Sequence, residues 1–269
     1  MSEHASSFSV RMFSILMILF LLGIDLFTYF LQPSIKAFSH LAFGVLIAQF
    51  LCSLVFLKGE ICNGQRQRLS NVHRYFMLFW LVWFGFSLFS NQHYVLTDLV
   101  CLCGFMMCLT CWTQPQEPQL RRSLLIMGTL SGLIGVLCYL MIFIELPVVL
   151  WLPANIFAQA LVGVVLVNLA LTLSRNRLQG FIGLLPLLMG ILTLLNAIGS
   201  LILLFVYQQH QVNFSNHFAL MLYFLLHLFI MVLIAMPIFR KTRLGYRSLL
   251  VLLLCSATLP LWASFAYIA

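Results

Sequence analysis

The sequence predicts an all-α polytopic membrane protein, a single domain that forms a bundle of nine transmembrane helices. Hydrophobic residues make up 63% of the chain and charged residues only 7%, whereas a soluble domain carries about 45–50% and about 25%. Apolar runs recur that are long enough to cross hydrocarbon as helices, which takes ~20 residues. These runs do not alternate as the ~10-residue strands of a membrane β-barrel do. A helical bundle is therefore the predicted fold.

The apolar runs give the expected spans in chain order. We expect helices at residues 12–31, 37–57, 73–90, 96–113, 123–144, 154–174, 179–206, 217–238 and 247–267. The first run is longer than a signal-peptide core, and no A-x-A-like cleavage site follows it, so it predicts a retained helix. Pro33 and Pro153 stand at span ends, where helices tolerate proline. The third run is short and contains Gly85, so a bundle of eight spans is the alternative.

The basic residues predict the orientation. If the N-terminus is cytoplasmic and the C-terminus lies outside, thirteen of the fourteen Lys and Arg residues fall on the cytoplasmic side, and Lys36 alone falls outside. Cytoplasmic loops of membrane proteins carry such an excess of positive charge. Removal of the third span would place the later basic clusters outside, so the same bias supports nine spans.

The net charge of +8 indicates contact with anionic lipid rather than with nucleic acid. The basic residues form short clusters between the apolar runs, where they can contact the head groups of the cytoplasmic leaflet. No loop is long enough to hold a nucleic-acid-binding domain. The lipid bilayer is the expected partner, a small-molecule or ion ligand is possible, and the sequence leaves a protein partner open.

Three acidic residues lie in or at the edge of the spans, and Asp25 is the most informative. Asp98 and Glu145 stand within a few residues of the outer ends, where water and head groups reach them. Asp25 lies about six residues below the outer end of the first helix, ~9 Å deep at a rise of ~1.5 Å per residue. A charge in a bilayer costs at least ~2.5–3.5 kcal/mol, so such a residue is a functional candidate.

Further polar side chains fall at a similar depth in other helices. Pairs spaced i,i+4 share a helix face, and the expected layer consists of Asp25, Tyr29, Gln159, Asn196, Ser200, Tyr223 and His227. One interpretation is an outward-facing polar cavity lined by these residues. The other is interhelical hydrogen bonding, in which such side chains stabilise helix packing by ~0.6–2 kcal/mol each.

The cysteines and histidines do not form a recognisable cofactor site, and we expect no cofactor and no metal. Cys108 and Cys111 have the C-x-x-C spacing, but they lie near the cytoplasmic end, where thiols stay reduced. Free cysteine also serves as a small apolar filler in helix packing. A haem would need two histidines facing each other in the bundle, and only His227 is deep, whereas His40 is expected at the outer boundary.

Three functions remain open. The first is a small transporter or permease-like protein that uses the polar layer as its cavity. The second is a non-catalytic envelope protein, such as a partner subunit or a factor for membrane integrity or drug tolerance. The third is a lipid-modifying enzyme with Asp25, Glu145 and His227 as acid–base groups, although no intramembrane protease or hydrolase motif is present and a non-enzyme is expected. Short loops and a retained first helix favour a bacterial inner membrane.

Overall fold

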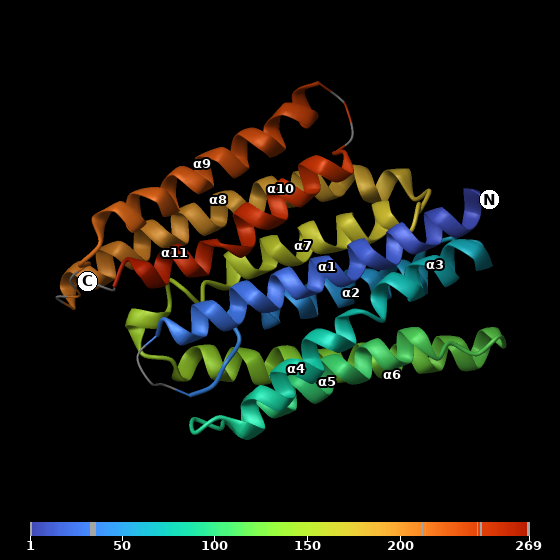
Figure 1. The fold of residues 1–269 in the computed structure, drawn as a ribbon, viewed down its shortest axis with the longest axis horizontal. Coiled ribbons are helices and arrows are strands. Elements are labelled where there is room, and N and C mark those ends of the chain that lie inside the picture. Colours follow the sequence, from blue (N-terminus) through green and yellow to red (C-terminus); the bar gives the residue numbers. More distant parts are fainter. Residues whose placement is uncertain are drawn as a thin grey trace.

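A computed structural model describes residues 2–32, 36–210, 212, 214–240, 242 and 244–267, with side chains from residue 11 onward. Apart from one short 3-10 turn, its regular elements are α-helices (Figure 1). They are α1 (Ser2–Phe30), α2 (Ala42–Lys58), α3 (Asn63–His73), α4 (Phe76–Phe89), α5 (Val95–Trp112), α6 (Pro118–Glu145), α7 (Ile156–Leu173), α8 (Gln179–Gln209), α9 (His217–Phe239), α10 (Tyr246–Ala257) and α11 (Leu259–Phe265).

The predicted helical membrane bundle is confirmed. Within the described residues, eight helical segments are long and apolar enough to span a membrane. Two of them are composite, since α3 runs into α4 and α10 runs into α11. The apolar helix α2 adds a ninth segment of 17 residues, which is ~26 Å long and close to the thickness of the hydrocarbon core. The two ends of the chain lie at opposite ends of the bundle (Figure 1).

Three expected boundaries were wrong. Residues 37–41 were expected to begin the second span, but the chain there is not helical and helix α2 begins only at Ala42. The last span is divided at Thr258, and Pro260 stands in the first turn of α11, the position where helices tolerate proline. The segment before the third span was expected to be a loop, but it forms the polar helix α3.

The centre of the bundle is formed by α2 and α7. Helix α7 is the most completely buried of the candidate spans, and its contact with α2 is among the most extensive between helices. The backbones meet at Gly44 and Gly163, where a Cβ on either glycine would overlap a backbone carbonyl oxygen of the other helix. Small residues allow such close approach between membrane helices. Helices α6, α8 and α9 expose many large apolar side chains, as lipid-facing helices do.

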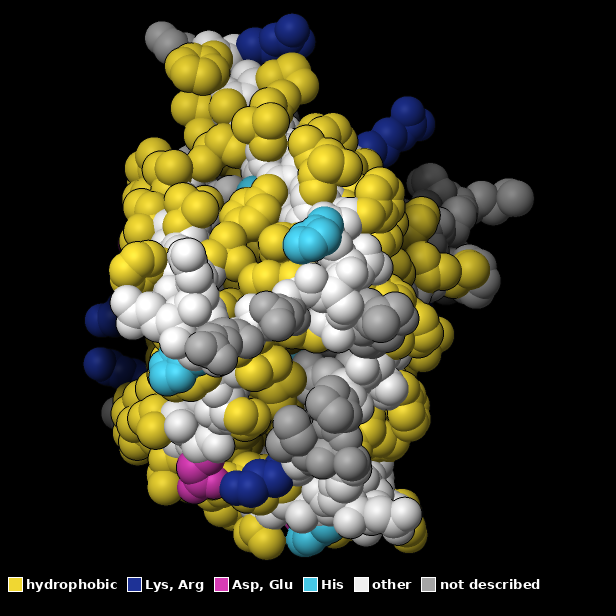
Figure 2. All heavy atoms as spheres, turned by 90° about the vertical axis from the view of Figure 1, so that its left-hand side faces the viewer, with side chains coloured by type: hydrophobic (Ala, Val, Ile, Leu, Met, Phe, Trp, Pro, Cys, Tyr) yellow, Lys and Arg dark blue, Asp and Glu magenta, His cyan; other side chains and the backbone are white. Residues whose placement is uncertain are grey.

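The two ends of the bundle differ in charge. The end of the bundle at which α1 begins will be called the basic end (Figure 1). Lys and Arg residues of α3, of the neighbouring helix ends and of the turns between them lie there, namely Lys58, Arg66, Arg68, Arg74, Arg121, Arg122, Arg175, Arg177, Arg240 and Arg247. Figure 2 views the opposite end, which is mainly apolar or uncharged. There Lys36 Nζ donates to Glu145 Oε2 at 2.6 Å, in the exposed surroundings that were expected for Glu145.

Candidate functional site

The non-helical segment before α2 lies inside the protein, and distant residues satisfy its backbone. Residues 37–41 are all buried. The Ala37 N–H donates to the Gln92 carbonyl at 2.8 Å, and Thr97 Oγ1 donates to the Ala37 carbonyl at 2.6 Å. Non-helical backbone at membrane depth is tolerated only where protein or a water-filled cavity surrounds it. The non-helical conformation of this segment therefore depends on the polar groups that bind its backbone.

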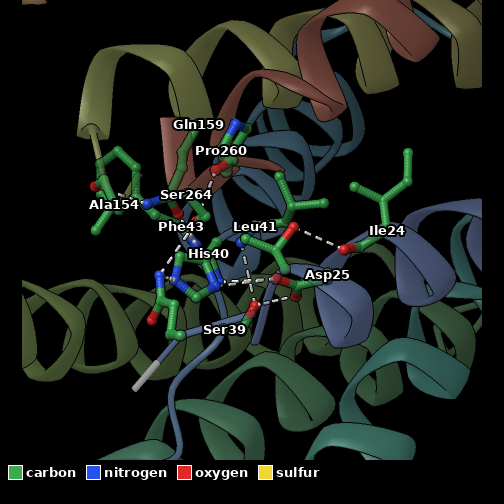
Figure 3. A network of polar contacts seen from close by, with 12 residues as sticks. Ile24, Asp25, Ser39, His40, Leu41, Phe43, Ala154, Gln159, Pro260 and Ser264 are labelled. Carbon is green, nitrogen blue, oxygen red and sulfur yellow. Dashed lines mark hydrogen bonds and ion pairs between the residues drawn. The ribbon is translucent and has the colours of Figure 1, made fainter. Parts of the chain in front are cut away.

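Asp25 of α1 lies against the segment at residues 37–41, and its side chain is fully buried (Figure 3). The carboxylate accepts hydrogen bonds from the Ser39 hydroxyl and from the His40 backbone N–H at 2.8 Å. Both donors stand just before the first turn of α2, so the carboxylate lies near the positive end of that helix dipole. A negative charge is stabilised in this position.

The imidazole of His40 is the nearest titratable partner of Asp25. Its Nδ1 lies 3.7 Å from Asp25 Oδ1, and both side chains have 0% exposure. On the other side of the ring, Nε2 lies 2.6 Å from the amide nitrogen of Gln32. With that amide as donor, Nε2 accepts and the ring proton stands on Nδ1, facing the carboxylate. Among the described residues, Nδ1 is buried and has no hydrogen-bond partner.

The short helix α11, after the interruption in the last span, contacts the same site through Gln32. The Gln32 amide also reaches Ser264 Oγ at 3.5 Å, and the Ser264 hydroxyl donates to the Pro260 carbonyl at 2.9 Å. Ser264 belongs to α11, the short helix that follows the interruption in the last span. The site thus connects α1 with the segment before α2 and with α11 (Figure 3).

Gln159 of α7 joins the same network through Tyr139 of α6. The Gln159 amide nitrogen donates to the Tyr139 hydroxyl at 2.6 Å and to the Ala154 carbonyl at 3.0 Å. The Tyr139 hydroxyl donates to the Ser39 carbonyl at 3.1 Å, and Gln159 Oε1 accepts from the Phe43 N–H at 3.1 Å. Asp25 and Gln159, expected in one layer, are therefore linked through Tyr139 and Ser39.

Comparison with known proteins places this bundle in a family. Residues 4–265 match a protein family described as an integral membrane domain. The chain belongs to that family. An uncharacterized protein of Haemophilus influenzae is similar, with 43% identity over 266 residues that cover 98% of this chain and all of the relative. No solved structure matches the chain.

The other residues expected in the polar layer lie elsewhere in the integral membrane domain. The Asn196 amide nitrogen is 2.5 Å from His227 Nε2, and Ser200 Oγ is 2.8 Å from the Tyr223 hydroxyl. Both contacts join α8 to α9, and the hydrogen bonds found among the described residues do not connect them to Asp25. Tyr29 points elsewhere too, since its hydroxyl donates to Gln92 Oε1 at 2.8 Å.

The sequence reasoning missed four residues of the site, namely Gln32, Ser39, His40 and Tyr139. His40 was placed at the outer boundary, whereas it is fully buried beside Asp25. The sequence offered only the adjacent polar pair Ser39-His40 inside an apolar run as a signal. Among the described residues, no group of three or more His, Cys, Asp or Glu side chains could hold a metal ion.

Proposed function

We propose that this integral membrane domain is a small multi-pass transporter of a bacterial inner membrane, in which the Asp25–His40 pair exchanges a proton or a cation. The observation that carries the proposal is the buried carboxylate of Asp25, which lies beside the start of α2 and 3.7 Å from the buried imidazole of His40. Ionisable residues inside a membrane mark ion and proton pathways. Transporters commonly place such sites at discontinuous helices, whose exposed ends complement the charge of the ligand.

A cavity at the basic end also supports transport. It has a volume of about 240 Å³ and is bordered by α7, α8 and α9. Pro186 and Pro237 line it from inside α8 and α9, and each proline removes one helical hydrogen bond. The amide nitrogen of Asn168 is buried and has no hydrogen-bond partner within the described part of the chain. An unpaired donor beside two weakened helices suits a segment that changes conformation.

The second candidate function is the non-catalytic envelope protein, and one observation favours it. Asp25, Thr97, Tyr139 and Gln159 all bind backbone groups of residues 37–43. Their hydrogen bonds are what a buried non-helical segment and the start of a helix require, whether or not an ion moves. In that case Asp25 acts as a cap, and its charge has no further role.

Charge movement after a pH jump tests the proposal. The purified protein, reconstituted in liposomes on a solid-supported membrane, is exposed to a rapid pH step with Na⁺ or K⁺ as the background cation. A transporter should give a transient current in the wild type, and Asp25→Asn should abolish it, because the amide cannot release a proton. Asp98→Asn is the matched control, since Asp98 pairs with His93 at 2.6 Å outside this network.

The outcomes separate the two candidates. Loss of the current in Asp25→Asn at unchanged membrane abundance, with a normal current in Asp98→Asn, supports transport. A wild-type protein without pH-dependent current, combined with a lower melting temperature for Asp25→Leu, would leave only the structural role.

A further inference from the structure

A second cavity lies at the basic end, between α3 and the turn that joins α5 to α6. Its volume is about 740 Å³. Most of its lining is polar and comes from those two segments, including Arg66, Gln67, Gln114, Gln116 and Arg121. A cavity between helices that is lined by amides and guanidinium groups differs from the apolar packing elsewhere in the bundle.

Two positive charges face this cavity without an acid to balance them. Arg66 and Arg121 are each partly buried, and they lie close enough for their charges to repel each other. In the described portion of the chain, the salt bridges involve neither of them. The acids of the neighbouring turns, Glu60 and Glu117, are exposed and do not line the cavity. Two converging cations without a counter-ion favour the binding of an anion.

The guanidinium of Arg66 is held in place by protein contacts. Its Nη1 donates to Gln114 Oε1 at 3.0 Å and to the Phe56 carbonyl at 3.3 Å, and the Phe56 ring lies 5.9 Å from its Cζ. These contacts use one nitrogen of the guanidinium. No described residue hydrogen-bonds to the edge formed by Nε and Nη2, and such a planar pair of donors matches the oxygens of a phosphate.

We propose that this cavity binds a phosphate group, presented either by a phospholipid head group or by a soluble phosphate compound. Several oxygens on one tetrahedral centre can accept from Arg66 and Arg121 together, and bound phosphate removes their mutual repulsion. The surrounding amides of Gln67 and Gln116 supply neutral donors. The site is separate from Asp25, so it stands or falls independently of the transport proposal.

Thermal stabilisation by defined probes tests the site and identifies the source of the phosphate. The full-length protein in a neutral detergent is titrated with inorganic phosphate, pyrophosphate, dioctanoyl phosphatidylglycerol or dioctanoyl phosphatidylcholine, and the melting temperature is followed. Saturable stabilisation by the phosphatidyl lipids alone identifies a head-group site. Saturable stabilisation by phosphate or pyrophosphate identifies a site for soluble ligands. No saturable shift with any of the four probes overturns the proposal.

Neighbouring arginines provide matched controls. Arg66→Gln and Arg121→Gln should each weaken the apparent Kd by about tenfold to a hundredfold, since a hydrogen bond to a charged group contributes about 1.5–3 kcal/mol. Arg68→Gln and Arg122→Gln remove the same charge from the same helices, but neither residue lines the cavity. Equal weakening in all four variants would mean diffuse charge attraction and would refute a specific site. Arg66→Lys should bind with an intermediate affinity, because it keeps the charge and loses the planar donor pair.

Discussion

Replacement of Gly163 by alanine should separate the two central helices. A methyl group at this position would overlap the carbonyl oxygen of Gly44 in α2 and would lie 2.8 Å from the Cβ of Ile47. Carbon atoms in good contact are about 3.5–4.0 Å apart, so the two helices would have to move apart by about 1 Å. A backbone carbonyl cannot rotate away as a flexible side chain can.

The expected cost follows from this geometry. Overpacking a well-packed core costs about 1–3 kcal/mol, and the rigid partner atom places Gly163→Ala near the upper value. At about 2–4 °C per kcal/mol for a chain of this size, the melting temperature should fall by ~6–12 °C. Tryptophan fluorescence of the purified protein in detergent during a thermal ramp measures this change.

Gly85→Ala is the control for that substitution. Gly85 also lies in a helix, but a Cβ there would meet nothing within 4 Å. This variant should melt at the wild-type temperature or slightly above it, because alanine is the better helix former. If the Gly163→Ala variant has the same melting temperature as the Gly85→Ala variant, the close approach of α2 and α7 does not limit stability.

Three further predictions concern other parts of the molecule. Alkaline phosphatase fused after Gln92 should be active and the same fusion after Gln116 inactive; the reverse pattern would invert the orientation. Changing Cys108 or Cys111, both buried and free, to alanine should preserve expression and activity, whereas inactive single variants at normal protein levels would indicate redox chemistry. The hydrogen bond that Lys36 donates to Glu145 raises the pKa of Lys36, so at alkaline pH any stabilisation by this pair persists up to ~10.4, the ordinary lysine pKa, and is lost as the pH rises further. Because the pair is exposed and screened by solvent, Lys36→Gln should leave the melting temperature at pH 7 unchanged, and a clear drop would contradict this.

The helical bundle was predictable because its cause is local. Each span is an apolar run of sufficient length, and every expected run corresponds to helical structure. The non-helical segment at residues 37–41 was not predictable in this way, since Ser39 and His40 stand inside an otherwise apolar run that is long enough for a span. The segment is not helical because Gln92, Thr97 and Tyr139, all distant in the sequence, satisfy its backbone groups.

The candidate site was predictable only in part, for a similar reason. Asp25 stood out because an acid in a membrane span is costly. Depth along a helix could not show which residues face one another, so His227 was grouped with Asp25, although it pairs with Asn196. His40 looked like a boundary residue because the start of α2 was placed too early. Whether the expected polar layer lines a cavity in any state of the protein stays a prediction.

The glycine contact between α2 and α7 has a consequence for biosynthesis. The ribosome makes Gly163 about 120 residues after Gly44, which at ~5–20 residues per second is a delay on the order of ten seconds. During that time the face of α2 that will receive α7 has only lipid or earlier helices beside it. Helix α2 is also short for a membrane span and ends in Lys58. Its sequence must therefore be stable in two successive environments, first the bilayer and then the protein interior. A bulkier residue at Gly44 would be tolerated while α2 faces lipid, but it would prevent the later packing of α7 against α2.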